Sequence, residues 1–205
     1  MQQAQPTVST EMHVLPALLA VVVAVPLPTL EGQPLSVRWM MPAKLAGAIP
    51  TGREREPFAL EARPCGRTWE TETDFHSGPG GRWQLDVYPP ITTTYRVRWN
   101  NRTSRILTVR VRPSVVLRPN GRGRFVVTIT AAREFDGRTG ALERFDRRTG
   151  RFVRARTIRF DDAGPAGQLR VTTAHVRAIA AGTLVRAFFP RSACYLAGFS
   201  NTLKS

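Results

Sequence analysis

Hydrophobic and polar residues alternate along most of the chain in short segments. In residues 107–111, LTVRV, the leucine and the two valines fall on one side of an extended segment and the polar residues on the other. This period of two marks a half-buried antiparallel strand, and residues 125–130, FVVTIT, repeat it. Turn residues separate such segments about every eight to twelve positions, which is typical of β-sandwiches. Because helical periodicity is nearly absent, we predict an all-β fold with less than about a tenth of the residues in helix.

The most apolar stretch is residues 15–30, LPALLAVVVAVPLPTL. It is shorter than the ~20 residues that span a bilayer, it contains three prolines, and no arginine or lysine precedes it, so it fits neither a membrane helix nor a secretion signal. Its β-branched valines suit a buried strand. This strand either completes the protein's own first sheet or adds to the sheet edge of a neighbouring subunit. The residues of this assembly strand are Leu18, Leu19, Val21, Val22, Val23 and Val25.

An internal repeat indicates the architecture. The matching segments, in order, are 59–61 with 141–143, 84–87 with 168–171, and 95–99 with 185–189. After the first match, each copy continues through a turn to an aromatic residue, Trp69 or Phe152, so both copies predict a hairpin. One strand ends at Arg112 and the next begins at Ser114. A linker this short implies that the two repeats touch.

The chain has 205 residues and a formal net charge of +15, from 30 Lys and Arg against 15 Asp and Glu. Such a charge attracts anionic surfaces. However, lysine occurs only at Lys44 and Lys204, and the arginines are scattered instead of forming one block. This distribution favours a solvated basic surface, as in a codon-biased or thermophilic source, over a nucleic-acid groove. We therefore predict no specific nucleic-acid partner and no membrane span.

The segments TTTYRVRW (92–99) and SRILTVRVRP (104–113) resemble the last two strands of bacterial immunoglobulin-like and fibronectin-type-III-like modules. The hairpin LEARPCGRTWE (60–70) and the strand GGRWQLDV (80–87) are similar to such modules in tandem in secreted actinobacterial proteins. The resemblance covers about residues 33–205 and implies two immunoglobulin-like β-sandwiches, residues 33–112 and 113–205. The N-terminal apolar strand segment, residues 1–32, precedes them and is longer than such modules require. The resemblance also implies an extracellular or cell-surface location and a mechanical, adhesive or spacer role, without identifying a ligand.

The topology of such modules brings the two cysteines together. Cys65 follows the third strand of the first module, at the end that faces the second module. Cys194 lies between the last two strands of the second module, at the end that faces the first. We therefore predict an intrachain Cys65–Cys194 disulfide that fixes the angle between the modules and places the protein in an oxidising compartment. Two free buried thiols, or a bridge between subunits, are the alternatives.

No group of residues has the spacing of a catalytic or cofactor motif. The three histidines are dispersed, and with two cysteines they supply too few convergent ligands for zinc. The glycine-rich segments 78–81 and 120–123 are predicted turns without the pattern of a phosphate-binding loop. Asp161 and Asp162 also predict a turn in preference to a calcium site. We expect no enzymatic activity, no cofactor and no metal.

Aromatic residues interleave with arginines at Trp69, Trp83, Trp99, Phe188 and Phe189. This pattern also suits a platform that stacks on bases or sugars. Because sandwich interiors are built from alternating large residues, we assign these aromatics to the core, together with residues 39–41, Trp-Met-Met.

These features together predict a non-enzymatic extracellular structural protein whose main partner is another copy of itself. Addition of the apolar strand to a neighbouring sheet would build a surface filament or appendage. The alternative is a surface or virion-decorating module that binds a glycan or a surface protein. Such a module would expose an aromatic cluster rimmed by polar groups, whereas a filament subunit would expose an unpaired strand edge.

Overall fold

The computed structural model describes residues 26–121, 124–132, 135, 138–160, 170–177 and 181–205. These residues form an all-β structure with no α-helix among them, and their one short helical turn is the 3₁₀ segment η1 (Pro79–Gly81). The predicted all-β fold class is confirmed.

The strands fall on either side of Pro113, and we call residues 26–112 the first half and residues 114–205 the second half. The strands of the first half are β1 (Glu31–Gln33), β2 (Ser36–Arg38), β3 (Ala43–Ala48), β4 (Pro57–Pro64), β5 (Glu70–His76), β6 (Arg82–Val87), β7 (Thr93–Trp99), β8 (Arg102–Thr103) and β9 (Leu107–Arg112). Those of the second half are β10 (Ser114–Pro119), β11 (Arg124–Ala131), β12 (Thr139–Asp146), β13 (Arg151–Arg159), β14 (Arg170–Arg177), β15 (Leu184–Phe189), β16 (Gly198–Phe199) and β17 (Leu203–Lys204).

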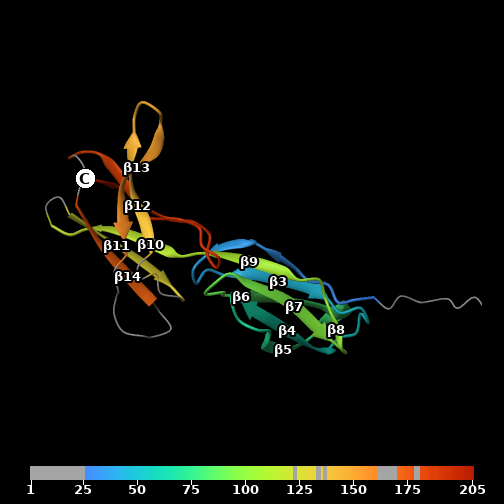
Figure 1. The fold of residues 1–205 in the computed structure, drawn as a ribbon. Helices are drawn as coiled ribbons and strands as arrows, with labels where there is room; N and C mark the ends of the chain where they lie inside the picture. Colours follow the sequence, from blue (N-terminus) through green and yellow to red (C-terminus); the bar gives the residue numbers. More distant parts are fainter. Residues whose placement is uncertain (1–25, 122–123, 133–134, 136–137, 161–169, 178–180) are drawn as a thin grey trace, which may run out of the picture.

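Each half contains two sheets, and both halves follow one sandwich-like plan (Figure 1). The first half has the strand orders β1-β3-β6 and β2-β9-β7-β4-β5, with β8 beside β7. The second half has β10-β11-β14 and β13-β12-β15-β16, with β17 also beside β15. The hairpins β4–β5 and β12–β13 each carry a register shift at the same point of the repeat, after Leu60 and after Leu142. The internal repeat seen in the sequence is therefore a repeat of structure.

The predicted alternation produces the core. Thr93, Tyr95, Val97 and Trp99 of β7 are buried, as are Phe125, Val127, Ile129 and Ala131 of β11. Trp83 and Phe189 are also core residues, as predicted.

The prediction that residues 39–41 belong to the core is wrong for its two methionines, which are 52% and 54% exposed. A turn follows β2, in which the Met41 amide donates to the Arg38 carbonyl and Met40 has a φ of 60°. This turn leaves both side chains on the outside, while Trp39 is half-buried.

The chain enters the first half along β3. The Thr29 amide donates to the Ala48 carbonyl, and the Ala48 amide donates to Thr29 Oγ1. Gly47 permits this approach, because a Cβ there would lie 2.1 Å from the Thr29 carbonyl oxygen. Strand β1 continues the pairing from Glu31, so the predicted boundary after residue 32 falls inside this strand. The predicted assembly strand, residues 18–25, lies outside the described residues.

The last strand of the second half is not continuous. It is divided into the short β16 and β17, because the residues between them use their side chains to bond neighbouring backbone. Ser200 Oγ accepts from the Ala187 amide, and the Asn201 side chain bonds both the amide and the carbonyl of Leu117 at 2.9 and 3.0 Å.

Candidate functional site: the junction and the outer sheet faces

A disulfide joins the two halves. Cys65 follows β4 and Cys194 lies between β15 and β16, and their Cα atoms are 5.5 Å apart. Thr92 lies between the two cysteine backbones, since its carbonyl accepts from the Cys65 amide at 2.9 Å and its amide donates to the Cys194 carbonyl at 3.2 Å. The structure thus contains the disulfide expected from the topology, and no described cysteine is free.

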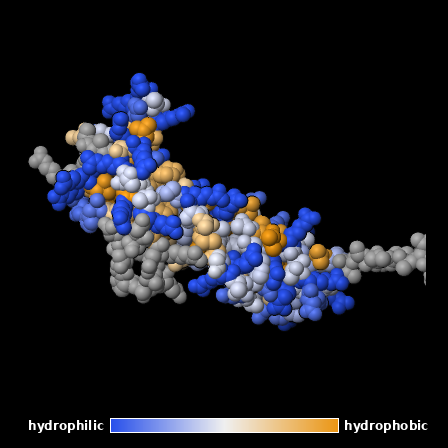
Figure 2. All heavy atoms as spheres, in the orientation of Figure 1, coloured by the Kyte–Doolittle hydropathy of each residue, from blue (hydrophilic) through white to orange (hydrophobic). Residues whose placement is uncertain are grey.

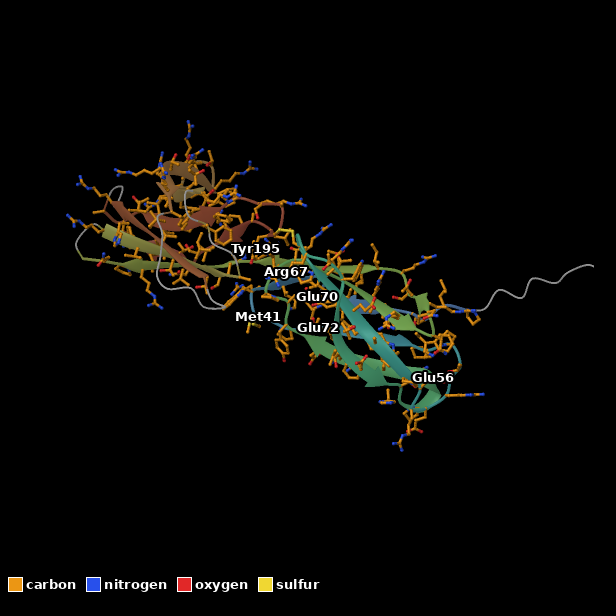
Figure 3. The ribbon with its side chains drawn as sticks, turned by 60° about the horizontal axis from the view of Figure 1, so that its bottom comes forward. Met41, Glu56, Arg67, Glu70, Glu72 and Tyr195 are labelled. Atoms are coloured by element: carbon orange, nitrogen blue, oxygen red, sulfur yellow. A yellow bond between two sulfur atoms is a disulfide. The ribbon has the colours of Figure 1, made fainter. Side chains whose placement is uncertain are left out.

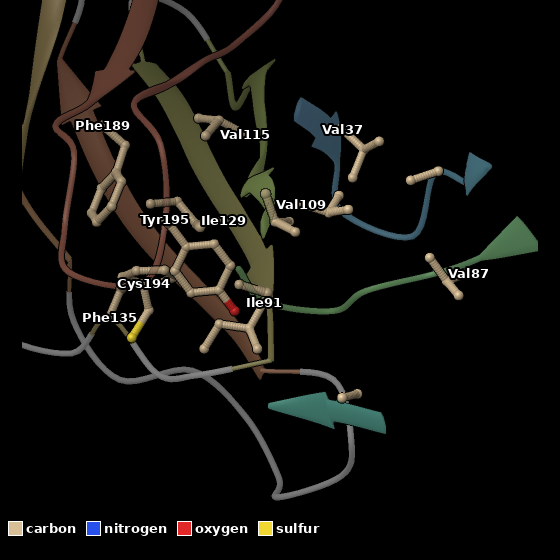
Figure 4. Packing of buried hydrophobic residues seen from close by; sticks show 14 of the residues in the cluster. Val37, Val87, Ile91, Val109, Val115, Ile129, Phe135, Phe189, Cys194 and Tyr195 are labelled. Carbon is tan, nitrogen blue, oxygen red and sulfur yellow. The ribbon is translucent and has the colours of Figure 1, made fainter. Parts of the chain in front are cut away.

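Tyr195 fills the junction beside the disulfide. It is 2% exposed, and its ring packs against Phe135 with the ring centres 5.4 Å apart. Its hydroxyl accepts from the Ala132 amide of the second half at 3.0 Å and donates to the Pro90 carbonyl of the first half at 3.1 Å. Figure 4 shows this hydroxyl directed toward Ile91. One buried side chain therefore satisfies polar backbone groups of both halves.

The residues after Tyr195 extend the contact along β9. The Leu196 amide donates to the Val111 carbonyl at 2.8 Å, and Arg112 Nη1 donates to the Ala197 carbonyl at 3.0 Å. Gly198 then packs on β10, where a Cβ would lie 2.8 Å from Val115 Cγ2. Together with the single residue Pro113 between β9 and β10, these contacts hold the two halves in one orientation.

A shallow hollow of about 330 Å³ lies on the first half beside the disulfide. It is lined by Arg63, Pro64, Cys65, Gly66, Arg67, Thr92 and Thr94. It contains arginines and threonines but no histidine or carboxylate, so it has no group suited to general acid–base work near neutral pH.

The residues considered for catalysis or metal binding do not converge. The described residues contain no group of three or more His, Cys, Asp or Glu side chains that is placed to hold a metal ion. His76 ends β5 and His175 lies on β14, both exposed, while His13, Asp161 and Asp162 lie outside the described residues. Within the described chain, no helix is long and apolar enough to cross a membrane.

A buried carboxylate organises the outer face of the larger sheet in the first half. Glu61 on β4 is 8% exposed and accepts from Arg96 Nε at 2.6 Å and from Arg98 Nε at 2.5 Å, both on β7. Burial alone raises the pKa of Glu61, but the hydrogen bonds and charges of Arg98 and Arg96 outweigh it and hold the pKa below its ordinary value.

Trp69 lies on this outer face and is not a core residue, so the core assignment was wrong for it. The guanidinium of Arg96 lies 4.2 Å from the Trp69 ring centre, and that of Arg63 lies 4.9 Å away. The indole is half-buried beside these two cations, which stabilise it by cation–π attraction.

The second half repeats this arrangement with different chemistry. Arg186 on β15 donates to Glu143 on β12 at 2.7 Å and lies 4.1 Å from the Phe152 ring centre. These residues stand where Arg96, Glu61 and Trp69 stand in the first half.

Phenylalanines replace the other arginines of this face. Phe145 takes the position of Arg63 and Phe188 that of Arg98. Phe145 contacts Phe152 and Phe188 contacts Phe199, with ring centres 5.4 and 5.1 Å apart. Phe188 is therefore a half-buried residue of the outer face, contrary to its core assignment.

Sequence reasoning named Trp69, Phe152 and Phe188 but missed Phe145 and Phe199, and it did not predict the association of these rings with the glutamate-bound arginines. The spacing that signals it is an Ala-Leu-Glu strand, an aromatic residue after the next turn, and an arginine on the strand that pairs with the glutamate. The chain matches no family model, and no curated protein is similar enough to it to count as a relative.

Proposed function

We propose that the protein is a non-enzymatic extracellular structural protein, a filament or appendage subunit built from two tandem immunoglobulin-like sandwiches. The strand order supports this, because each half pairs a three-stranded sheet with a larger sheet. The order β5-β4-β7-β9 of the first half corresponds to β13-β12-β15-β16 of the second, and β2 is an additional edge strand of the first half. A disulfide in a β-rich chain is typical of an oxidising, extracellular environment.

The observation that carries the proposal is the junction between the halves. The disulfide, the buried Tyr195 and the one-residue linker hold the halves in a fixed relation. A subunit whose two ends keep a constant orientation repeats the same head-to-tail contact with each added copy. Such a heterologous contact builds an open filament when its rotation does not close a ring.

The N-terminal segment supports assembly through strand addition. Residues 26–30 reach β3 at Ala48, at the pole of the first half away from the second half (Figure 1). The apolar residues Leu18, Leu19, Val21, Val22, Val23 and Val25 precede this point. We propose that they add to a sheet edge of a neighbouring copy, where backbone hydrogen bonds give affinity and alternate side chains give register.

Electron microscopy and sedimentation of the full chain test this proposal. Particles should elongate as the protein concentration rises. A Val21→Asp/Val23→Asp variant should stay monomeric, because it places charges on one face of the strand, while the matched Val21→Ile/Val23→Ile control should elongate. Monodisperse wild-type particles at high concentration, or elongation of the aspartate variant, would contradict the proposal.

A surface-binding module is the second candidate, and the outer face of the second half favours it. Phe145, Phe152, Phe188 and Phe199 line this face around Arg186, and Phe199 is 45% exposed. An exposed aromatic group beside a guanidinium suits the ring of an acidic sugar. A glycan array probed with the wild type and with a Phe199→Ala variant distinguishes this function, because only a glycan binder loses signal in the variant.

A further inference from the structure

Two edge strands of the larger sheets carry opposite charges. Strand β5 ends the order β2-β9-β7-β4-β5, and β13 ends the order β13-β12-β15-β16. Strand β5 contains Glu70, Glu72 and Asp74 and no arginine or lysine. Strand β13 contains Arg151, Arg154, Arg156 and Arg159 and no carboxylate. All of these charged residues are exposed.

The two edges are equivalent in the repeat but lie apart in the molecule. Both follow the matching hairpin turn, after Pro64 in one half and after Asp146 in the other. Figure 3 shows Glu70 and Glu72 along the first half, and Figure 1 shows the β12–β13 hairpin projecting from the second half. Figure 2 shows hydrophilic side chains around this projection. No described strand pairs with the outer side of β5 or of β13.

The charges decide which pairings between copies are favourable. An edge strand presents unpaired backbone groups and is a template for another strand, and charged side chains restrict what it accepts. Two β5 edges would oppose carboxylates, and two β13 edges would oppose arginines, so contacts between identical edges are repulsive. When a β5 edge lies against a β13 edge, carboxylates lie opposite arginines. The two edges then attract each other, and the charges select this pairing over pairing of identical edges.

We infer that β5 of one copy pairs with β13 of a second copy, which joins the larger sheets of the two molecules into one. The inference rests on the proposed filament function and names its second interface, apart from the N-terminal strand. Because the contact uses two different surfaces, an assembly of any length keeps one acidic edge at one end and one basic edge at the other, and assembly propagates.

Charge-reversal variants of the full chain test the pairing. The first variant is Glu70→Lys/Glu72→Lys/Asp74→Lys and the second is Arg151→Glu/Arg154→Glu/Arg156→Glu. Each alone has two edges of the same sign, so we expect the concentration needed for elongation to rise more than about tenfold at low salt. In an equimolar mixture each edge again meets its opposite, and elongation should return with the two variants alternating. The matched control is Glu54→Lys/Arg105→Glu, which reverses exposed charges in loops and should assemble as wild type does.

The outcomes separate this contact from the wider proposal. Suppose that wild type elongates and that either each charge-reversal variant alone elongates equally well or the mixture of the two variants stays monomeric. The β5–β13 pairing is then wrong, and the filament proposal stands. If wild type never elongates, both are wrong. Far-ultraviolet circular dichroism checks that each variant folds. If the β5 triple variant does not fold, the single variant Glu72→Lys replaces it, and if the β13 triple variant does not fold, the single variant Arg154→Glu replaces it.

Discussion

Replacing both cysteines with alanine measures what the disulfide contributes to the coupling of the two halves. The bonded cysteines are separated by 129 residues in sequence. In the chain-entropy model, closing a loop of this length lowers the entropy of the unfolded chain and so stabilises the folded state by about 5 kcal/mol. Native disulfides more commonly contribute about 2–5 kcal/mol. Alanine is the suitable replacement, because Cys194 is 7% exposed and a serine hydroxyl there would need a buried partner.

The Cys65→Ala/Cys194→Ala variant should lose about 2–5 kcal/mol of unfolding free energy in urea, followed by tryptophan fluorescence. The junction hydrogen bonds of Thr92 and Leu196 remain in the variant, each contributing roughly 1 kcal/mol. Because these bonds are weaker than the covalent link, we expect the single transition of the oxidised protein to broaden or separate into two. Wild type under reducing conditions should follow the variant. If the variant lost less than about 1 kcal/mol of unfolding free energy and its transition were unchanged, the disulfide would not be what couples the two halves.

Two further predictions concern single side chains. Tyr195→Phe leaves the Ala132 amide and the Pro90 carbonyl without the hydroxyl that bonds both. It should therefore lower the unfolding free energy measured in urea by about 1–3 kcal/mol. The control Tyr88→Phe, at a residue that is 54% exposed, should leave the unfolding free energy unchanged. Glu61→Gln should lower stability at pH 7 by about 1–2 kcal/mol. Because the folded pKa of Glu61 lies below its ordinary value of 4.5, the stabilisation is complete above that pH and is lost as the pH falls through the folded pKa. The difference between wild type and Glu61→Gln should therefore shrink on acidification, while exposed Glu54→Gln should show no difference at any pH.

Much of the fold could be predicted because its signals are local. A period of two and frequent turn residues define strands without reference to tertiary contacts. The repeat added long-range information, since matching segments in one order require matching topologies. For this reason the hairpins and the one-residue linker at Pro113 followed from the sequence. The proximity of Cys65 and Cys194 followed from the topology of immunoglobulin-like modules, which the sequence resembles.

The remaining features depend on contacts that no local pattern encodes. Trp69 and Phe188 are large and apolar, and a sandwich interior is the usual place for such residues. Guanidinium groups and neighbouring rings on the outer face of a sheet can also pack against large apolar side chains. Such a packing site can be recognised only when the pairing of the strands is known. The divided last strand has a similar origin, because Asn201 bonds Leu117, which is distant in sequence.

The two outer faces also show which of their residues the fold requires. Glu61 and Glu143 each lie against an arginine on the neighbouring strand, and both halves keep this pair. Glu61 is 8% exposed, so its carboxylate needs hydrogen-bonded cations, and loss of the arginines alone would leave a buried charge unpaired. Arg63 makes no such contact with Glu61, and Phe145 takes its position in the second half. Arg98 shares Glu61 with Arg96, whereas Phe188 takes its position in the second half, where Arg186 bonds Glu143. Substitution at Arg63, Phe145 or Phe188 should therefore leave the sheet beneath these side chains intact.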